Sequence, residues 1–313
     1  MTSLVFMGTP DFSVPILTML YEEGYSILAV VTQPDRPVGR KKLLTPTPVK
    51  KEALRLGLPV LQPQKLKGSQ QLDEILSLNP DIIITAAFGQ ILPKELLDSP
   101  KYGCLNVHAS LLPAYRGGAP IHQAIMDGQL QTGVTIMYMA QKLDAGDIIS
   151  QKAIAIEVSD TTGILFEKLS VVGCDLLKST LPTILSESNE RTVQDESLVT
   201  FARNISREQE RINWNEPSQD IYNKVRGLNP WPVAYTTLKQ EAVKVWWGKP
   251  SQQSYSQPVG TVVELQVDRI VVQTGNEQAF EITELQPAGK KKMSAEEFLR
   301  GTGSKLQIGD QFQ

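Results

Sequence analysis

Two side chains with the chemistry of a proton-transfer site lie two positions apart in NVHASLLPAYRGGAP, residues 106–120. They are Asn106 and His108, and the chain has only one further histidine. If the apolar run before them continues as a strand, its two-residue period puts both side chains on the same side. A neutral imidazole accepts a proton near pH 7, and an amide N–H stabilises a developing oxyanion. The pair is a candidate active site, although Asn-x-His alone also fits a structural histidine that bonds a backbone carbonyl.

A carboxylate that can act on such a histidine occurs further along the chain, in KLDAGDIIS. Its Asp144 and Asp147 lie in a turn just before a predicted strand. If one of them lies beside His108, its negative charge favours the protonated imidazolium. An aspartate in a turn also commonly caps the backbone, and the spacing does not decide between these two roles.

Two turns near these residues are candidates for ligand contact. The loop SLLPAYRGGAP is rigid enough for its backbone to line a flat ligand, although it also fits an ordinary surface loop. The stretch FMGTPDFS is a strand-to-helix turn that lacks the G-x-G-x-x-G fingerprint of dinucleotide-binding sites. A helix N-terminus there can still bind a polar group.

Positive charge gathers in one early segment of an acidic chain. The net charge is −3, yet residues 33–67 carry nine basic side chains against Asp35 and Glu52. The nine are Arg36, Arg40, Lys41, Lys42, Lys50, Lys51, Arg55, Lys65 and Lys67. Such a segment is either an anion-binding site or a solvated loop and helix face. The overall charge argues against a protein that coats nucleic acid through bulk electrostatics.

Strand and helix signals alternate through the first half of the chain and must position these residues. Short apolar runs predict strands at residues 3–8, 25–32, 81–87 and 103–108. Apolar strands separated by helices are typical of a parallel sheet covered on both faces, whose ligands bind beyond the carboxyl ends of the strands. His108 lies at such an end. Residues 134–140 and 146–158 predict further strands of the same domain, and residues 161–188 predict a long amphipathic helix.

The pattern changes after about residue 188. A polar stretch follows, which we interpret as a linker, and short alternating strands come next, at residues 242–247, 260–265, 269–274 and 279–285. Strands at this close spacing predict a small all-β barrel. A chain of 313 residues also favours two domains over one.

Composition indicates a soluble globular protein, with 41% hydrophobic and 21% charged residues. No apolar run reaches the roughly 18 residues that span a bilayer, and the first residues have no signal- or transit-peptide pattern. We therefore expect a cytoplasmic protein with no membrane partner. Cys104 and Cys174 lie among apolar neighbours and are expected to be free thiols, and the few Cys and His residues predict no metal site.

The order and spacing of these motifs together resemble those of the folate-dependent formyltransferases. The resemblance covers the whole chain and rests on GTPDFS, TQPDRPVGRKK, NVHASLLPAYRGGAPI, GVTIM, LDAGDI, ISREQERINW, GLNPWPVAY and LQPAGKKKMSAEEFL. Asn-x-His, Ser-Leu-Leu-Pro and Leu-Asp-x-Gly-Asp mark the family generally. The stretches TQPDRPVGR and NPWP…QPAGKK narrow the resemblance to its tRNA-directed members.

The resemblance implies an α/β fold. A formyltransferase domain with a doubly wound, mostly parallel sheet is followed by a small OB-like β-barrel domain. The expected boundaries are residues 1–188 for the formyltransferase domain, 189–205 for the linker and 206–313 for the tRNA-binding barrel. We expect the protein to be a monomer.

The resemblance also implies a reaction and its residues. The α-amine of initiator methionyl-tRNA attacks the formyl carbon of 10-formyltetrahydrofolate and releases tetrahydrofolate, with no metal and no covalent enzyme intermediate. Asn106, His108 and Asp144 match the family's catalytic trio, as oxyanion donor, proton carrier and orienting carboxylate. The residues expected to bind the folate are Ser110, Leu111, Leu112 and Pro113, with Ala87, Phe88 and Gly89 near the pterin. The residues expected to bind the tRNA are Arg40, Lys41 and Lys42, with Lys290 and Lys291 in the barrel.

Three alternatives remain open at this point. A sugar-amine formyltransferase or a formyltetrahydrofolate hydrolase would use the same trio, and only the basic loop and the barrel argue against them. A non-enzymatic RNA-binding protein would explain the barrel and its lysines but not the trio. A nicotinamide dehydrogenase shares the predicted sheet but needs the glycine fingerprint that the chain lacks.

Overall fold

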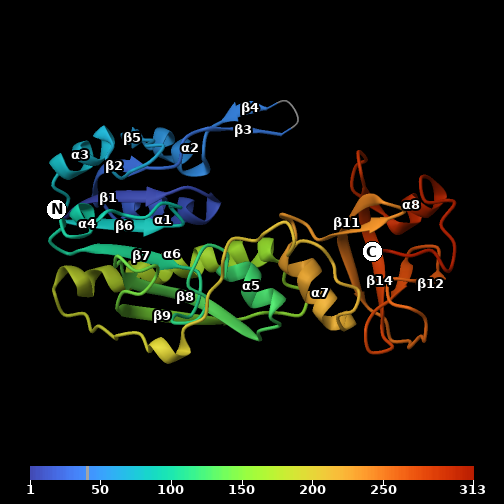
Figure 1. Ribbon diagram of the computed structural model, residues 1–313. Helices are drawn as coiled ribbons and strands as arrows, with labels where there is room; N and C mark the ends of the chain where they lie inside the picture. Colours follow the sequence, from blue (N-terminus) through green and yellow to red (C-terminus); the bar gives the residue numbers. More distant parts are fainter. Residues whose placement is uncertain (40–41) are drawn as a thin grey trace. The chain divides into compact units, whose positions relative to one another are not determined.

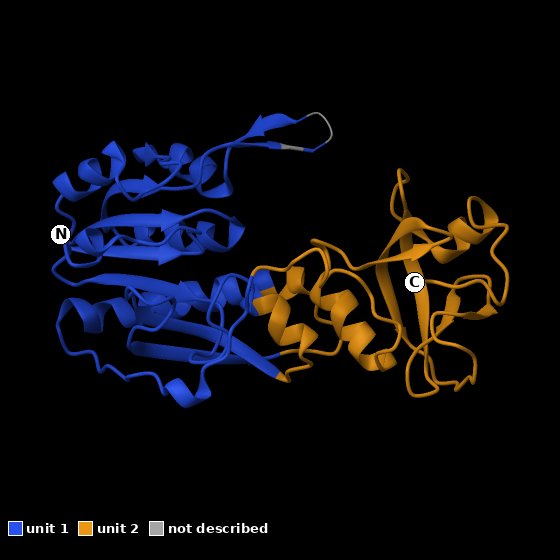
Figure 2. Cartoon of the chain, in the orientation of Figure 1, with its two compact units in different colours: residues 1–120, 131–155, 166–203 blue, residues 121–130, 156–165, 204–313 orange. Residues whose placement is uncertain are grey.

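The computed structural model describes residues 1–39 and 42–313 and divides the chain into two compact units (Figure 2). Unit 1 comprises residues 1–120, 131–155 and 166–203, and unit 2 comprises residues 121–130, 156–165 and 204–313. The units interleave along the sequence, because two short segments that lie between parts of unit 1 in the chain belong to unit 2.

Among the described residues, a seven-stranded sheet forms the centre of unit 1, in the order β5-β2-β1-β6-β7-β8-β9 (Figure 1). Its parallel strands are β1 (Ser3–Gly8), β2 (Ser26–Val31), β5 (Val60–Leu61), β6 (Ile82–Ala86) and β7 (Cys104–His108). The antiparallel strands are β8 (Gln131–Tyr138) and β9 (Ile148–Ala155). The strand order reverses between β1 and β6, and sheets of this kind bind ligands beyond the strand ends at that point.

Helices cover both faces of this sheet. On one face, α3 (Gln70–Ser77) and α4 (Lys94–Leu97) pack into a cluster whose buried members include Val5, Met7, Leu72, Ile75, Ile83 and Leu96. On the other face lies α6 (Thr162–Leu185), where a Cβ added to Gly173 would come within 2.9 Å of the Val107 side chain. Cys174 of the same helix lies 3.6 Å, from Sγ to oxygen, from the carbonyl of Pro15 in α1 (Val14–Glu22).

Local sequence sets where several of these elements begin. The 3-10 helix η1 (Asp11–Ser13) follows β1, and the buried Ser13 hydroxyl donates to the carbonyl of Ala86 at 2.6 Å. Helix α2 (Pro48–Arg55) begins after Thr47, whose hydroxyl accepts from the amide of Lys50 at 3.1 Å. The segment before α2 forms a two-stranded hairpin of β3 (Arg36–Val38) and β4 (Leu43–Thr45).

An antiparallel sheet forms the centre of unit 2, in the order β10-β11-β14-β13-β12, with β15 paired to β14. Its strands are β10 (Tyr235–Leu238), β11 (Glu241–Pro250), β12 (Val262–Leu265), β13 (Ile270–Gln273), β14 (Ala279–Pro287) and β15 (Met293–Ser294). Isolated bridges join Phe312 to Leu238 and Gln311 to Thr261. The end of the chain thus links the two edges of the sheet, which closes it as a barrel is closed.

Helices α7 (Ser218–Gly227) and α8 (Ala295–Arg300) pack onto the sheet of unit 2 in one apolar cluster that includes Ile221, Val225, Phe280 and Phe298. Helix α7 also binds the segment 156–165. Arg226 Nη1 donates to the carbonyls of Glu157 and Asp160 at 3.3 and 3.2 Å, and the Tyr222 hydroxyl donates to the carbonyl of Val158 at 3.0 Å. Helix α5 (Pro120–Met126) contributes Met126 to the edge of the cluster.

The polar segment before unit 2 makes ordered contacts with unit 1. Thr192 and Ile148 exchange two backbone hydrogen bonds of 2.9 and 2.8 Å. A bridge between Arg116 and Phe201 lies beyond η2 (Glu196–Leu198). This part of the chain therefore belongs to the architecture of unit 1, in addition to leading into unit 2.

The predicted fold class is confirmed. Unit 1 has a mostly parallel sheet with helices on both faces, and unit 2 has a small antiparallel sheet of the barrel type. None of the described helices has both the length and the apolar character that crossing a membrane requires.

Both cysteines of the chain are free thiols, and Cys104 is buried in β7. Burial, reinforced by the charge of Asp98, raises the pKa of the Cys104 thiol to about 12. At pH 8 a thiol with such a pKa is ionised in about one molecule in 10,000, and the thiolate is the reactive form.

We therefore expect native Cys104 to resist iodoacetamide at pH 8. Mass spectrometry of the native protein should find this residue unmodified, whereas the protein unfolded in guanidinium should carry the label on both cysteines. Labelling of native Cys104 at the rate of an exposed thiol would contradict the burial and the raised pKa.

Candidate active site

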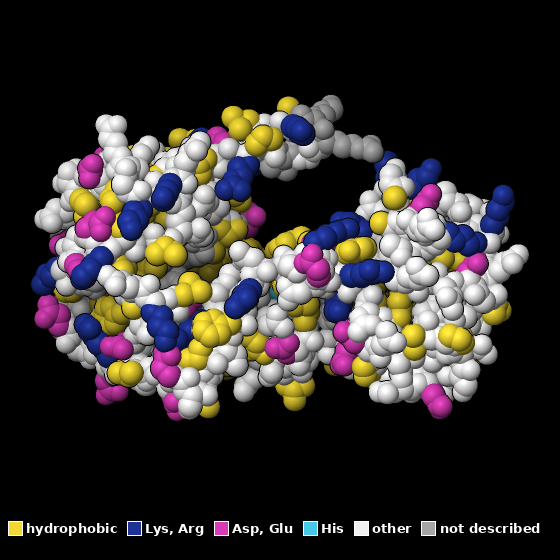
Figure 3. Space-filling model, viewed as in Figure 1, with side chains coloured by type: hydrophobic (Ala, Val, Ile, Leu, Met, Phe, Trp, Pro, Cys, Tyr) yellow, Lys and Arg dark blue, Asp and Glu magenta, His cyan; other side chains and the backbone are white. Residues whose placement is uncertain are grey.

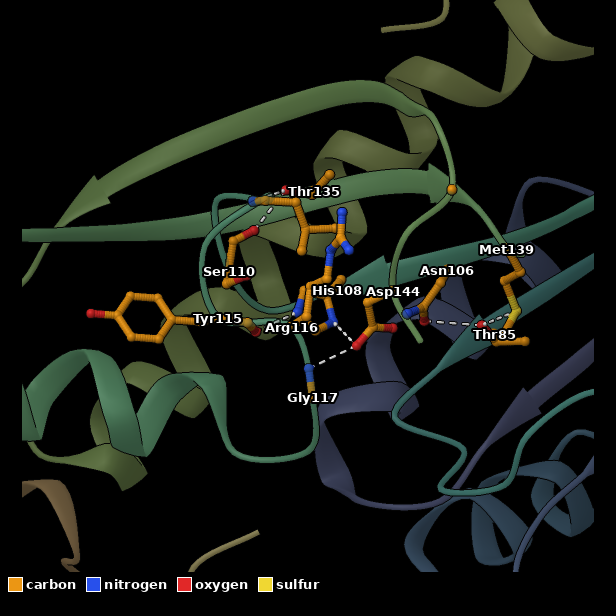
Figure 4. A network of polar contacts seen from close by, with 12 residues as sticks. Thr85, Asn106, His108, Ser110, Tyr115, Arg116, Gly117, Thr135, Met139 and Asp144 are labelled. Carbon is orange, nitrogen blue, oxygen red and sulfur yellow. Dashed lines mark hydrogen bonds and ion pairs between the residues drawn. The ribbon is translucent and has the colours of Figure 1, made fainter. Parts of the chain in front are cut away.

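Asn106 and His108 lie at the carboxyl end of β7 (Figure 4). They alternate with Val107, which faces α6. The parallel register with β6 places Asn106 opposite Thr85, and the antiparallel register with β8 places His108 opposite Thr135. A buried threonine thus stands beside each of these two polar residues. The sheet itself positions this group, because main-chain pairing fixes which residues stand side by side.

The Asn106 amide is oriented by Thr85. The Thr85 hydroxyl lies 2.9 Å from Asn106 Oδ1, 2.9 Å from the carbonyl of Leu105 and 3.3 Å from the sulfur of Met139. With Oδ1 engaged as an acceptor, Nδ2 is the end of the amide that can donate. No described residue accepts a hydrogen bond from Nδ2. The amide can therefore donate to an oxygen of a bound molecule.

His108 is buried, with 6% of its side chain exposed, and its two ring nitrogens face different groups. Nε2 lies 3.1 Å from the carbonyl oxygen of Tyr115. A carbonyl oxygen only accepts, so Nε2 carries the hydrogen of this bond. Nδ1 faces the carboxylate of Asp144, at 3.8 Å from Oδ2 (Figure 4). Nδ1 is thus the nitrogen that can take and release a proton, beside a negative charge.

Asp144 is held in an unusual backbone conformation, with φ at 47° in the left-handed region. Its Oδ2 accepts a hydrogen bond from the amide of Gly117 at 2.8 Å. Two positions further on, a Cβ added to Gly146 would lie 1.9 Å from the carbonyl oxygen of Tyr138. This close approach demands glycine and ties the turn to the end of β8.

The loop predicted to bind folate is fixed around one hydroxyl. The Thr135 hydroxyl is fully buried, donates to the carbonyl of Ser110 at 2.7 Å and accepts from the amide of Leu112 at 3.1 Å. Gln151 Nε2 lies 2.8 Å from the same hydroxyl and 2.9 Å from the carbonyl of Leu112. Ser110 donates its own hydroxyl to the carbonyl of Ala114 at 2.7 Å. The loop is thereby preorganised directly after His108.

The second predicted folate segment is a turn after β6. Phe88 is buried, and its carbonyl accepts from the Thr9 hydroxyl at 3.0 Å and from Gln33 Nε2 at 3.2 Å. The residues on either side, Ala87 and Gly89, are exposed and have positive φ values of 46° and 83°. Their backbone groups are accessible to a ligand, and Thr9 belongs to the GTPDFS turn.

The residues predicted to bind tRNA fall in separate places. Arg40 and Lys41 lie outside the described residues. Lys42 is exposed and precedes β4, where Leu43 and Leu44 are 64% and 69% exposed. Figure 3 shows hydrophobic side chains gathered on this hairpin. Lys290 and Lys291 are exposed in the turn after β14, in unit 2.

Sequence reasoning missed several residues that hold the site. Thr85 was detectable, as the single polar position of an apolar strand that neighbours β7. Thr135 gave no such signal, because β8 also contains Gln131 and Thr132. Arg116 lies inside a motif that we interpreted only as a loop, and Gln194 lies in the polar stretch that we interpreted only as a linker. The paired exposed leucines of β4 are a further signal, since they interrupt a strongly charged segment.

Asn106, His108 and Asp144 together can support proton transfer and stabilisation of an oxyanion. A donor at Asn106 Nδ2 can stabilise an oxyanion, and His108 Nδ1 can move a proton with the Asp144 carboxylate beside it. These are the groups that addition of a nucleophile to a carbonyl carbon requires. Among the described residues, no cluster of three or more His, Cys, Asp or Glu side chains is placed to hold a metal ion.

Comparison with known proteins assigns both parts of the chain. Residues 1–181 match the formyl transferase family, and residues 204–303 match the formyl transferase C-terminal domain. Methionyl-tRNA formyltransferase of Lysinibacillus sphaericus (strain C3-41) is 67% identical over 313 residues, which is 100% of both chains. The Bacillus cytotoxicus enzyme of the same name is 60% identical over 309 residues, which cover 99% of this chain and 98% of its own.

Solved structures share the fold at low identity. An N-formyltransferase from Helicobacter canadensis, in complex with folinic acid and dTDP-3-aminofucose, has a TM-score of 0.68 and 18% identity over 92% of this chain and 100% of its own. HypX from Aquifex aeolicus, in complex with tetrahydrofolic acid, has a TM-score of 0.66 and 17% identity over 99% of this chain and 48% of its own.

The buried Thr135 hydroxyl generates a stability prediction. Thr135→Val keeps the shape of the side chain but leaves the amide of Leu112 and the carbonyl of Ser110 without this partner. An unsatisfied buried group costs about 1 to 3 kcal/mol, and we expect the free energy of unfolding to fall by about that amount in urea titrations. Thr132→Val is the control, since Thr132 is a buried threonine of the same strand that makes none of these contacts. Equal stability of the two variants would contradict the prediction.

Proposed function

The chain belongs to the methionyl-tRNA formyltransferase family, and from this premise we propose that it transfers the formyl group of 10-formyltetrahydrofolate to the α-amine of methionine on initiator tRNA. The observation that carries the proposal is the 67% identity over the full length of a methionyl-tRNA formyltransferase. The protein is thus a transferase of translation initiation. The N-formyltransferase structure with folinic acid and dTDP-3-aminofucose, at 18% identity, is far more distant in sequence.

We assign the transfer step to Asn106, His108 and Asp144. The amine nitrogen attacks the formyl carbon, and the electron pair of the carbonyl moves to its oxygen. Asn106 Nδ2 donates to this oxyanion. His108 Nδ1 takes the proton that the amine loses and returns it to N10 of the folate as the carbon–nitrogen bond breaks, which releases tetrahydrofolate. The Asp144 carboxylate stabilises the imidazolium between these two proton transfers.

The folate is assigned to the loop 110–113 and the turn 87–89. The accessible backbone at Ala87 and Gly89 suits the donors and acceptors of a pterin edge. The loop is held by Thr135 and Gln151 in one conformation, so a ligand that binds along it has little ordering cost. The loop also follows His108 directly in the chain, which supports a formyl group bound near Nδ1.

The tRNA is assigned to two basic regions. The first is the β3–β4 hairpin with Arg40, Lys41 and Lys42, whose exposed leucines can pack on bases while its charges meet phosphates. The second is the turn with Lys290 and Lys291. We further propose that the protein works as a monomer in the cytoplasm, with domain boundaries at residues 1–188 and 206–313.

The direct test of the function uses the purified chain with 10-formyltetrahydrofolate and either methionyl-tRNA or free methionine. Formylmethionine should form only on the tRNA. In the same assay, His108→Ala should lower the rate about 10² to 10⁴-fold, the usual contribution of a proton-transfer group.

His122→Gln is the matched control, because it alters the other histidine of the chain, whose ring packs edge-on against Trp231 in unit 2. Its rate should stay near that of the wild type, and tetrahydrofolate should bind to both variants in calorimetry. A His108→Ala protein with wild-type turnover would refute the assignment.

The tRNA assignment predicts a change in salt dependence. Arg40→Ala should raise the KM for tRNA and flatten the plot of log affinity against log salt by about one unit of slope, because one phosphate contact is lost. Arg40→Lys should restore the slope but only part of the affinity, since an ammonium lacks the planar fork of guanidinium. The control is folate affinity, which should not change. Parallel salt plots of equal height for wild type and Arg40→Ala would end the assignment.

A further inference from the structure

The polar segment 192–202, which we call the strap, contacts both loops that face the His108 ring. At its start, Thr192 pairs with Ile148 just after the Asp144 turn. At its end, the amide of Arg116 donates to the carbonyl of Thr200 at 2.9 Å, and the amide of Ala202 donates to the carbonyl of Arg116 at 2.8 Å. The strap therefore runs from the loop that carries Asp144 to the loop that follows Tyr115.

One side chain of the strap joins the two loops directly. Gln194 is buried, with 6% of its surface exposed. Its Oε1 accepts from Arg116 Nε at 3.1 Å and from Arg116 Nη2 at 2.8 Å. Its Nε2 donates to the carbonyl of Asp144 at 2.8 Å and to that of Gly146 at 2.7 Å. The side-chain amide thus uses both of its N–H donors and both acceptor positions of its oxygen on these two loops.

Arg116 is an anchor that depends on this glutamine. Its side chain is fully buried, and its Nη1 has no hydrogen-bond partner among the described residues. The other nitrogens of its side chain bind Gln194 and Glu196. The Oε1 atom of Glu196 lies 3.0 Å from Nη2. When a buried guanidinium already has one unpaired N–H, the loss of any remaining contact is costly.

The same two loops determine what the His108 ring contacts. Tyr115, next to Arg116, supplies the carbonyl that accepts from Nε2. Asp144 supplies the carboxylate that faces Nδ1, and its backbone carbonyl accepts a hydrogen bond from Gln194. The left-handed backbone of Asp144 is unfavourable for a residue other than glycine and persists only where its surroundings hold it. Gln194 is placed to do this, because it binds the backbone carbonyl of Asp144 while Gly117 binds the carboxylate.

We propose that Gln194 is a positioning residue for the formyl transfer, which sets the Asp144 carboxylate against His108 Nδ1 without touching a substrate. The inference rests on the proposed function. Removal of an outer group that orients a metal ligand typically costs about 10 to 100-fold in affinity or activity, and we take the same scale for a group that orients a catalytic side chain. We therefore expect Gln194→Met, which keeps the length of the side chain, to lower kcat about 10 to 100-fold with little change in the KM for folate or tRNA.

Two further variants separate positioning from loss of stability. Gln194→Glu keeps an acceptor for Arg116 but removes the donor to Asp144 and Gly146, and it should show the same fall in kcat. Gln273→Met is the matched control, because Gln273 is also a buried glutamine whose Nε2 donates to two carbonyls, at 3.0 and 2.9 Å, in unit 2. Its kcat should match that of the wild type with saturating substrates.

A double-mutant cycle gives the decisive result. If Gln194 acts through Asp144, then Gln194→Met should cost less than about twofold in kcat once Asp144→Asn is present, because coupled changes do not add. NMR gives a second readout that needs no activity. At constant pH, Gln194→Met should shift the ring signals of His108 and leave those of His122 in place, and the chain has no other histidine.

The outcomes distinguish this inference from the proposed function. A wild-type protein that does not formylate methionyl-tRNA would overturn the function. A wild type that formylates, with His108→Ala inactive but the Gln194 and Asp144 effects fully multiplicative, would overturn the positioning role alone. Wild-type kcat in Gln194→Glu, or unchanged His108 signals in Gln194→Met, would overturn it as well.

Discussion

The hydrogen bond between His108 Nε2 and the carbonyl of Tyr115 is the constraint on which the site depends. A carbonyl oxygen only accepts, so this bond places a hydrogen on Nε2 and leaves the lone pair of the neutral ring on Nδ1. With Nε2 so assigned, Nδ1 is the ring nitrogen that faces the Asp144 carboxylate, at 3.8 Å from Oδ2.

The sheet and the loops divide the work of building this site. Strand pairing places Asn106 beside Thr85 and His108 beside Thr135, so the positions of these four residues follow from main-chain register. The groups that face the ring come from loops, which have no such register. Their precision has to come from side-chain bonds and from close packing, such as the contact of Gly146 with the end of β8. Rigid strands with loops secured onto them are a common way to hold catalytic groups.

The sequence predicted the fold class and the same-strand pair well, because both depend on local periodicity. Alternation along 104–108 is visible in five residues, and the strand–helix alternation is visible in the first hundred. The role of Asp144 came from the family resemblance, since a turn aspartate has a second ordinary explanation. Gln194 could not be predicted. Its bonds to Arg116 span 78 residues of sequence, and a polar stretch with no periodicity gives no signal of burial.

The interleaving of the two units has a consequence for the order of synthesis. The carbonyls of Glu157, Val158 and Asp160 receive their hydrogen bonds from Tyr222 and Arg226, between 64 and 69 residues later in the chain. A ribosome releases the segment 156–165 well before α7 exists, so these groups must stay hydrated until α7 emerges. Unit 2 is thus completed around a piece made long before it, and that piece follows β9 in the chain and includes the first turn of α6.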